Sequence, residues 1–276
     1  MTAASTFEPV RPIVLDFDGA VAPLPGELRV PLRQWQKPLR RSCRARTLAR
    51  FRADLDRVLP ATDGVVFIGS GQFHHVTLEL VRRWYAQGPF RVVVFDNHPD
   101  NVRCPRRIHC GSWVRRVASL PIVRSVHVVG ITSPAASFAH VWGNYLTPLV
   151  LGKLTYWCIG PNTGWARWLG LGGRVRGFRS ARAMIDEFLD EQGYGRSPVY
   201  LSIDKDVLSL GAAQPKAAHG ALNVDDLLEA ITPLRDRLVG CDVTGDRSTG
   251  RGDSEQQQRD VNLRILAGLQ SALAVS

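Results

Sequence analysis

The sequence predicts an α/β fold in which a mostly parallel sheet is covered by helices on both faces, a three-layer α/β/α arrangement. Short runs of apolar residues alternate along the chain with longer helix-like stretches, which is the order of repeated strand–helix units. The runs are continuously apolar rather than alternating, as expected for strands that are buried on both faces. The length of 276 residues, 45% of them hydrophobic and 22% charged, suits one large globular domain.

The expected elements follow one another in a regular order. Strands are expected at residues 12–17, 65–69, 91–96, 125–131, 154–159, 198–204 and 237–243. Helices are expected at residues 43–58, 75–87, 137–145, 180–192, 224–235 and 255–274. Residues 142–178, rich in tryptophan and glycine, break this rhythm. They are expected to form an irregular insertion, either over the functional face or packed on the core or on another subunit, within a single domain spanning residues 1–276.

The composition argues against a membrane-spanning protein and against a disulfide-bonded one. No apolar run approaches the roughly 18 residues that cross a bilayer, and the N-terminus lacks a basic-then-apolar signal, so we expect a cytoplasmic protein without membrane contact. The five scattered cysteines form no paired motif, which argues for a reducing compartment.

The net charge of +10 is concentrated in the basic segment, residues 29–57. This segment is either the solvated face of an early helix or a patch for an anionic partner. We do not expect nucleic-acid binding, because neither interleaved aromatic residues nor a known nucleic-acid motif accompanies the charge.

Ionisable side chains follow the expected strands at their C-terminal ends, where open α/β sheets place their chemistry. Asp96, His98 and Asp100 follow one strand at alternate positions, so their side chains can converge on one point. Further groups at strand ends are His74 and His75 after residues 65–69, Asp204 and Asp206 after residues 198–204, and Asp242 in residues 237–243.

Aspartates with a few histidines fit hard divalent cations better than a thiolate zinc site. Several carboxylates around one ion would leave an excess of negative charge, whereas two ions that share bridging carboxylates balance it. A pair of ions can hold a hydroxide between them and lower its pKa towards neutrality. The pattern therefore predicts a hydrolase with two divalent metal ions.

These motifs resemble, in order and spacing, those of the arginase–agmatinase (ureohydrolase) family over about residues 65–246. The family motifs Gly-Gly-Asp-His-Ser, Asp-x-His-x-Asp and Ser-x-Asp-x-Asp stand here as Gly71-Gln-Phe-His74-His75, Asp96-Asn-His98-Pro-Asp100 and Ser202-Ile-Asp204-Lys-Asp206. The resemblance, to a divergent member, implies an arginase-like fold with two Mn²⁺ ions at the strand ends. It also implies cleavage of a C–N bond in a small guanidino or amidino substrate by a metal-bridging hydroxide, and a homo-oligomer as one option.

The resemblance further implies a role for each matching residue. The ligands would be His74, Asp96, Asp100 and Asp204 for one ion, and Asp96, His98, Asp204 and Asp206 for the other. Either His74 or His75 can be the histidine ligand of the first motif. His74 keeps the family's spacing to Thr77, and His75 would then contact the substrate.

Three catalytic roles follow from the same resemblance. Asp100 would orient the hydroxide, His109 would pass a proton to the leaving amine, and Asp242 would bind the cationic group of the substrate. Asp242 stands where the family has a glutamate, so its side chain is one methylene shorter. Arg103 and Arg106 follow Asp100, in place of the arginase segment that recognises an amino acid, and either receive a substrate carboxylate or phosphate or are solvated. Arginine is therefore not the substrate that we expect first.

Three other functions remain open. An arginase-fold deacetylase would use one zinc held by Asp, His and Asp. Asp16 and Asp18 resemble the first motif of haloacid-dehalogenase-type phosphatases, in which the first aspartate attacks phosphorus. A non-catalytic protein would bind a partner through the basic segment. Metal stoichiometry, phosphate release and salt-dependent retention on nucleic acid would distinguish them.

Overall fold

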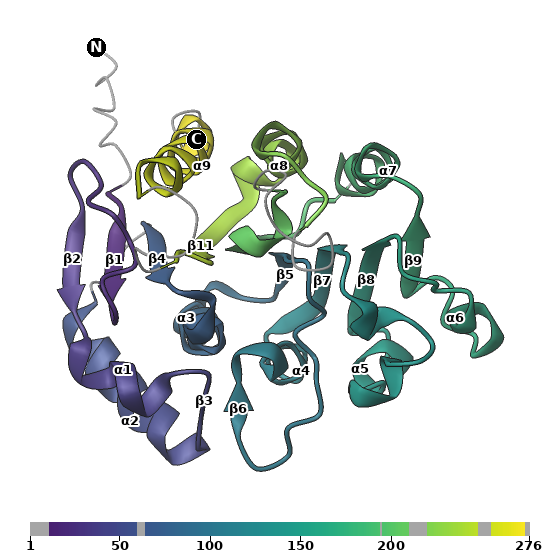
Figure 1. The fold of residues 1–276 in the computed structure, drawn as a ribbon, viewed down its shortest axis with the longest axis horizontal. Coiled ribbons are helices and arrows are strands. Elements are labelled where there is room, and N and C mark those ends of the chain that lie inside the picture. The colour runs from purple at the N-terminus through teal and green to yellow at the C-terminus, as the bar shows by residue number, and fades with distance from the viewer. Residues whose placement is uncertain (1–10, 60–63, 194, 210–219, 248–254, 274–276) are drawn as a thin grey trace.

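A computed structural model of the chain describes residues 11–59, 64–193, 195–209, 220–247 and 255–273. Its centre is a nine-stranded sheet in which every pair of neighbouring strands is parallel (Figure 1). The strands, in their order across the sheet, are β2 (Leu28–Pro31), β1 (Ile13–Asp16), β4 (Val65–Gly69), β11 (Leu238–Thr244), β10 (Val199–Asp204), β5 (Phe90–Phe95), β7 (Val123–Ile131), β8 (Leu154–Ile159) and β9 (Val175–Phe178).

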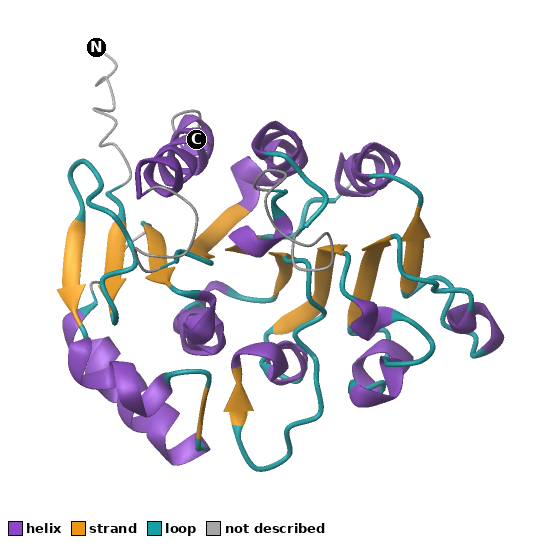
Figure 2. Ribbon diagram, viewed as in Figure 1, coloured by secondary structure: helices purple, strands orange, loops and turns teal. Residues whose placement is uncertain are grey.

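Helices cover both faces of this sheet (Figure 2), so the three-layer α/β/α prediction is confirmed. One face carries α7 (Ala181–Gly193), α8 (Val224–Ile231) and α9 (Glu255–Leu273). The other carries α2 (Ala45–Val58), α3 (Thr77–Arg83), α4 (Val114–Ala118) and α5 (Thr147–Val150). Two short helices, α1 (Arg33–Leu39) and α6 (Trp165–Trp168), lie towards the ends of the sheet. None of the helices in the described residues is long and apolar enough to cross a membrane.

The continuous apolar runs form strands because each face of the sheet has its own core. Along β5, Val92 and Val94 join the core under α2, α3 and α4, while Val93 and Phe95 join the core under α7, α8 and α9. Complete burial of such a side chain stabilises the fold by about 1.5–3 kcal/mol. Alternation of side chains along a strand thus fills both cores, and it also decides which face each polar residue at a strand end will point towards.

Some elements differ from the prediction. The edge strands β2 and β9 were not expected, because both are short and only partly buried. Residues 137–145, expected to be a helix, contain only a short 3-10 turn, η5 (Val141–Gly143). Residues 142–178, expected to be irregular apart from the strand at residues 154–159, supply α5, α6 and β9 as well as the expected β8, and so build one side of the sheet. A single domain over residues 1–276 stays a prediction.

The strand order places four strand ends side by side. β4, β11, β10 and β5 are consecutive in the sheet and run in the same direction, so their carboxyl ends share one edge. The segments after β4 and β10 turn at once into the 3-10 helices η1 (Gly71–Val76) and η6 (Lys205–Val207). This edge therefore collects residues from distant parts of the sequence.

Candidate metal centre

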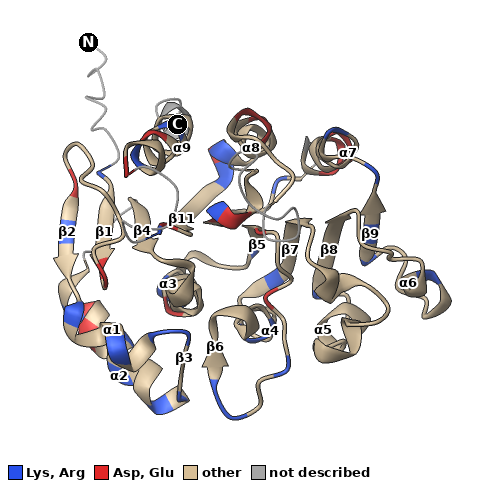
Figure 3. Cartoon of the chain, viewed as in Figure 1, with Lys and Arg blue, Asp and Glu red and all other residues tan. Residues whose placement is uncertain are grey.

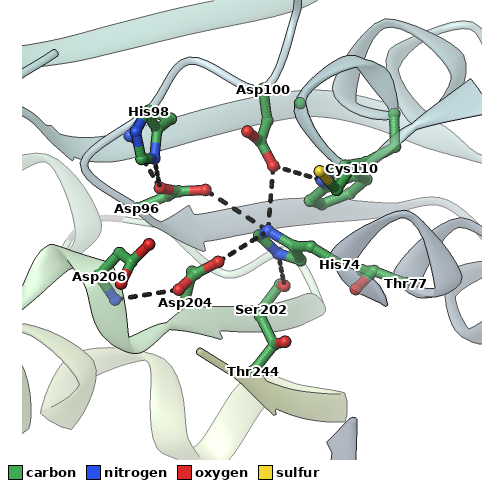
Figure 4. A network of polar contacts seen from close by, with 12 residues as sticks. His74, Thr77, Asp96, His98, Asp100, Cys110, Ser202, Asp204, Asp206 and Thr244 are labelled. Carbon is green, nitrogen blue, oxygen red and sulfur yellow. Dashed lines mark hydrogen bonds and ion pairs between the residues drawn. The ribbon is translucent and has the colours of Figure 1, made fainter. Parts of the chain in front are cut away.

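The residues predicted as metal ligands, together with His109, gather at this edge, around a cavity of about 470 Å³. The sequence-predicted residues that line the cavity are His74, His98, Asp100, His109, Asp204 and Asp206. Asp96 is buried beside them and contacts both His74 and His98 (Figure 4). Residues from β4, β5 and β10 are thus brought together as the sequence predicted.

His74 occupies the centre of the group, on η1, with only 1% of its surface exposed. Its Nδ1 lies 3.0 Å from Asp100, 3.3 Å from Asp204 and 3.5 Å from Asp96, measured to Oδ2 in each case. No described residue forms a well-aligned hydrogen bond with this nitrogen. Burial lowers the pKa of His74, but its contacts with the three carboxylates outweigh burial and hold that pKa well above its usual range.

Asp96, which directly follows β5, uses its two oxygens differently. Oδ1 accepts a hydrogen bond of 2.8 Å from the backbone N–H of His98 and lies 3.3 Å from His98 Nδ1. Oδ2 faces His74 and is buried without a hydrogen-bond donor among the described residues. Burial raises the pKa of Asp96, but the contacts with His74 and His98 outweigh it and bring the pKa down to about 2.

Asp100 is held in an unusual backbone conformation. Its φ is +43°, in the left-handed region that aspartate tolerates better than most residues. Its Oδ2 accepts a hydrogen bond of 2.7 Å from the indole N–H of Trp113, whose ring also packs against His74. Burial and, next, the charge of Asp96 raise the pKa of Asp100 to about 7. The strained turn and the indole thus aim this carboxylate at His74 Nδ1.

Asp204 and Asp206 occupy the turn after β10. Asp204 Oδ1 accepts a hydrogen bond of 2.9 Å from the backbone N–H of Asp206, which leaves Oδ2 towards His74. Burial, followed by the charges of Asp204 and Asp96, raises the pKa of Asp206 to about 7. Gly245 passes close by with φ +92°, and a Cβ there would lie 2.5 Å from Asp204 Oδ1. The glycine is therefore required by the approach of the β11 loop to the carboxylate.

Asp242 does not reach the cavity, which corrects its expected role in binding the substrate. In the register of β11 on β10, it pairs with Ser202 rather than with Asp204, so it lies one layer below the site. It is fully buried and accepts hydrogen bonds from Tyr200 (2.7 Å), Ser202 (2.8 Å) and Thr77 (3.1 Å). Burial raises the pKa of Asp242 to about 6, against the lowering effect of His74 and these donors.

The expected substrate contact of His75 needs the same correction, whereas the exposure of Arg103 and Arg106 agrees with the solvated alternative expected for them. His75 points into the core, fully buried, and does not belong to the described lining of the cavity. Arg103 and Arg106 are exposed, lie outside that lining too, and Arg103 donates instead to the backbone carbonyl of Asn144 at 3.0 Å. His74, not His75, is therefore the histidine of the first motif that faces the carboxylates.

His109 lines the wall of the cavity, as expected for a proton-transferring residue. It lies on β6 (Ile108–His109), which pairs with β3 (Ser42–Cys43). Its Nδ1 accepts a hydrogen bond of 2.9 Å from the backbone N–H of Gly111, so the proton of the neutral ring is on Nε2. Burial and, next, the charge of Arg41 lower the pKa of His109, which favours this neutral form.

Several residues of the site were not assigned from the sequence. Ser202 lies inside the Ser-x-Asp-x-Asp motif and Trp113 shortly after His109, but neither carries a signal of its own, because a hydroxyl or an indole is found in any fold. Asp246 and Arg247 also line the cavity. Asp246 is held by the buried Lys205, whose ammonium group it contacts, and Arg247 lies 3.6 Å from Asp206.

The phosphatase motif lies apart from this site. Asp16 accepts a hydrogen bond of 2.8 Å from the backbone N–H of Gly19 and lies 3.5 Å from Arg33, and neither Asp16 nor Asp18 is among the described residues that line the cavity. The basic segment forms β2, α1, β3 and α2 (Figure 3), and most of its arginines are exposed. This placement is compatible with both expected alternatives, a solvated helix face and a patch for an anionic partner.

The donor set fits a divalent cation. Within the described residues, ligand atoms of His74, Asp96 and Asp100 all lie within 4.8 Å of one another, and all three side chains are buried. A buried imidazole nitrogen without a hydrogen bond, facing three carboxylates, is unfavourable unless positive charge is placed between them. Oxygen and imidazole donors in this number suit Mn²⁺ or a similar ion.

Comparison with solved structures defines the class of fold. The hypothetical agmatinase of Burkholderia thailandensis superposes with a TM-score of 0.55 at 16% identity, over 96% of this chain and 87% of that one. The proclavaminate amidino hydrolase of Streptomyces clavuligerus gives 0.54 at 19% identity, over 83% and 69%. A Trypanosoma cruzi formiminoglutamase with Mn²⁺ gives 0.53 at 13% identity, over 83% and 72%. The chain therefore has the arginase-like ureohydrolase fold.

The sequence comparison adds a family. An uncharacterized protein of Thermotoga maritima is 30% identical over 218 residues, which cover 78% of this chain and 72% of that protein. The chain belongs to the same family as this protein. No protein-family profile matches the chain.

Proposed function

We propose that the chain is a metal-dependent hydrolase that cleaves a C–N bond in a small linear amidine, a guanidino or amidino compound. The observation that carries the proposal is His74 Nδ1, buried at the floor of the cavity within 3.5 Å of three carboxylates and without a hydrogen bond from the described residues. The amidino hydrolase, agmatinase and formiminoglutamase among the structural neighbours support this reaction class.

The proposed centre holds two divalent ions, Mn²⁺ in the first instance. His74 and Asp100 would bind one ion, His98 and Asp206 the other, and Asp96 and Asp204 both. The Mn²⁺ of the Trypanosoma cruzi structure supports this metal. Such ions supply a Lewis acid and bring the pKa of a shared water towards neutrality.

The residues around the proposed centre would position the attacking water and transfer a proton. Asp100, aimed by Trp113, would hold the attacking water by a hydrogen bond. His109, after taking up a proton from solvent, would pass a proton from Nε2 to the leaving amine at the cavity wall and return to the neutral ring with its other proton retained. The cavity volume of about 470 Å³ lies in the range of small-molecule sites, which supports a small substrate.

A hydrolase with one zinc ion is the second candidate, and one observation favours it. Only His74, Asp96 and Asp100 form a compact metal-binding group among the described residues, while half of the His98 side chain surface (49%) is exposed. One tightly held zinc per chain, together with deacetylation of an acetylated amine, would select this candidate.

Elemental analysis of the purified protein, combined with a screen for released urea or ammonia, tests the proposal. The screen covers guanidino and amidino compounds with and without an anionic group. We expect close to two divalent ions per chain and product release that stops when the ions are removed by chelation. A protein that binds no divalent ion when supplied with excess Mn²⁺ would rule the proposal out.

The remaining parts of the proposal concern the location of the protein in the cell, its domain organisation and its oligomeric state. We place the enzyme in the cytoplasm, supported by the five cysteines, all of which are free in the structure. We also propose a single domain and a homo-oligomer, which size-exclusion chromatography with light scattering would measure.

A further inference from the structure

The side of His74 that faces away from the cavity is fully hydrogen-bonded. His74 Nε2 lies 3.1 Å from Ser202 Oγ, and that hydroxyl lies 2.8 Å from Asp242 Oδ1 (Figure 4 shows His74 and Ser202). Tyr200 and Thr77 donate their own hydroxyl protons to the same carboxylate. Ser202 and Asp242 are completely buried, so bulk water does not contact these groups in the structure.

The proton positions in this series of hydrogen bonds follow from which groups can donate and which can only accept. A serine hydroxyl has one proton, and Asp242 as a carboxylate can only accept. Ser202 must therefore give its proton to Asp242, which leaves its oxygen as an acceptor towards His74. Nε2 of His74 then carries the ring proton, and in the neutral ring Nδ1 presents a lone pair to the carboxylates above it.

We propose that Asp242 is a positioning residue that acts through Ser202 to fix the tautomer of His74 and to leave Nδ1 free to bind a cation. The inference rests on the proposed function in one respect, that the cavity side of His74 holds a divalent ion. It gives Asp242 a role that differs from the substrate contact expected from its place in the sequence.

The reverse arrangement is unfavourable for a physical reason. If Ser202 donated to Nε2, its oxygen would face the Asp242 carboxylate at 2.8 Å with no proton between them. The ring proton would then be on Nδ1, directed at Asp96, Asp100 and Asp204, where it would occupy the place of a metal ion. The buried Asp242 carboxylate is therefore fully hydrogen-bonded only when Ser202 donates to Asp242 and accepts from His74 Nε2.

Metal affinity tests the proposal without relying on turnover. Asp242→Asn keeps the shape of the side chain but removes the charge, so the chain of hydrogen bonds can reverse. We expect the dissociation constant for Mn²⁺, from calorimetric titration, to rise about ten- to a hundred-fold, as for other residues that orient metal ligands. Tyr200→Phe is the matched control, because it removes a donor to Oδ2 and leaves the Ser202–Oδ1 contact intact; it should keep the wild-type affinity.

Ser202→Ala provides a second route if Asp242→Asn does not fold. It removes the hydroxyl itself, and it should weaken Mn²⁺ binding to a similar extent. Unchanged affinity in a folded Asp242→Asn or Ser202→Ala variant would overturn the proposal, as would an equal loss in Tyr200→Phe. A wild-type protein that binds no divalent ion would instead overturn the proposed function, and the inference with it.

The tautomer can also be observed directly. In protein labelled with ¹⁵N-histidine and loaded with diamagnetic Zn²⁺, long-range proton–nitrogen correlations report which ring nitrogen carries the proton. The His74 signal can be assigned by its loss in His74→Gln. We expect the proton on Nε2 and the metal on Nδ1; a proton on Nδ1 would contradict the proposal.

Discussion

Buried aspartates lie on both sides of the His74 ring, but the two sides differ in hydrogen bonding. On the cavity side, Asp96 Oδ2 and His74 Nδ1 are buried without a hydrogen bond from the described residues. On the core side, Asp242 accepts three hydrogen bonds and Ser202 connects it to Nε2. The difference shows that a buried aspartate on a neighbouring strand is not by itself a metal ligand. Both oxygens of Asp242 already accept hydrogen bonds, whereas Asp96 keeps one buried oxygen, Oδ2, without a donor among the described residues.

The largest effect is expected on the cavity side. Asp204→Asn removes a charge that contacts His74 and that would bridge both ions. We expect the variant to lose bound metal, measured by elemental analysis, and turnover to fall to the uncatalysed background. Full activity with normal metal content in this variant would remove the basis for the proposed centre.

A smaller effect is expected at the cavity wall. His109→Asn retains an oxygen that can accept from Gly111, but it has no proton to transfer at the position of Nε2. We expect kcat to fall about 10²- to 10⁴-fold, the usual contribution of acid–base catalysis. Metal content should stay that of the wild type. A variant with normal kcat would show that His109 is not the proton donor.

A weaker effect should follow from the indole that aims Asp100. Trp113→Phe keeps an aromatic ring against His74 but removes the N–H that donates to Asp100 Oδ2. We expect metal affinity or kcat to fall about ten- to a hundred-fold. Trp35→Phe is the control, because Trp35 also donates to an aspartate, Asp54, but on the distant α1 and α2 helices. Equal losses in the two variants would contradict a specific role.

The smallest effect should be confined to the core side. Tyr200→Phe leaves Asp242 Oδ2 without its donor, which should reduce the free energy of unfolding by about 1–3 kcal/mol. Denaturant titration of the metal-loaded protein measures this change. An effect of that size on stability together with a lost metal site would mean that the Tyr200 hydrogen bond, and not the Ser202 contact alone, is needed to hold Asp242 in its positioning role.

The fold was predictable because its central strands are continuous apolar runs. Val65–Gly69 and Leu154–Ile159 form strands within the expected limits. The edge strands β2 and β9 were missed because a strand with one neighbour and partial exposure lacks such a run. Residues 142–178 were expected to be irregular because glycines and tryptophans separate their short elements.

The clustering of the proposed metal ligands after β5 was predictable because spacing within one strand end is local. Asp96, His98 and Asp100 lie within five residues directly after β5, although a turn at Asp100 (φ +43°), and not the expected extended alternation, directs its carboxylate. The depth of Asp242 was not predictable, since it depends on the register of β11 against β10, where Thr244 rather than Asp242 pairs with Asp204. The direction of Arg103 likewise depends on its contact with Asn144, far along the chain.

A crystal structure grown with Mn²⁺, with anomalous data collected at the manganese edge, tests the central claim most directly. The account predicts two anomalous peaks in the cavity, one of them bonded to His74 Nδ1 and flanked by Asp96, Asp100 and Asp204. A manganese-soaked crystal with no peak beside Nδ1, or with the metal bonded to Nε2, would contradict it.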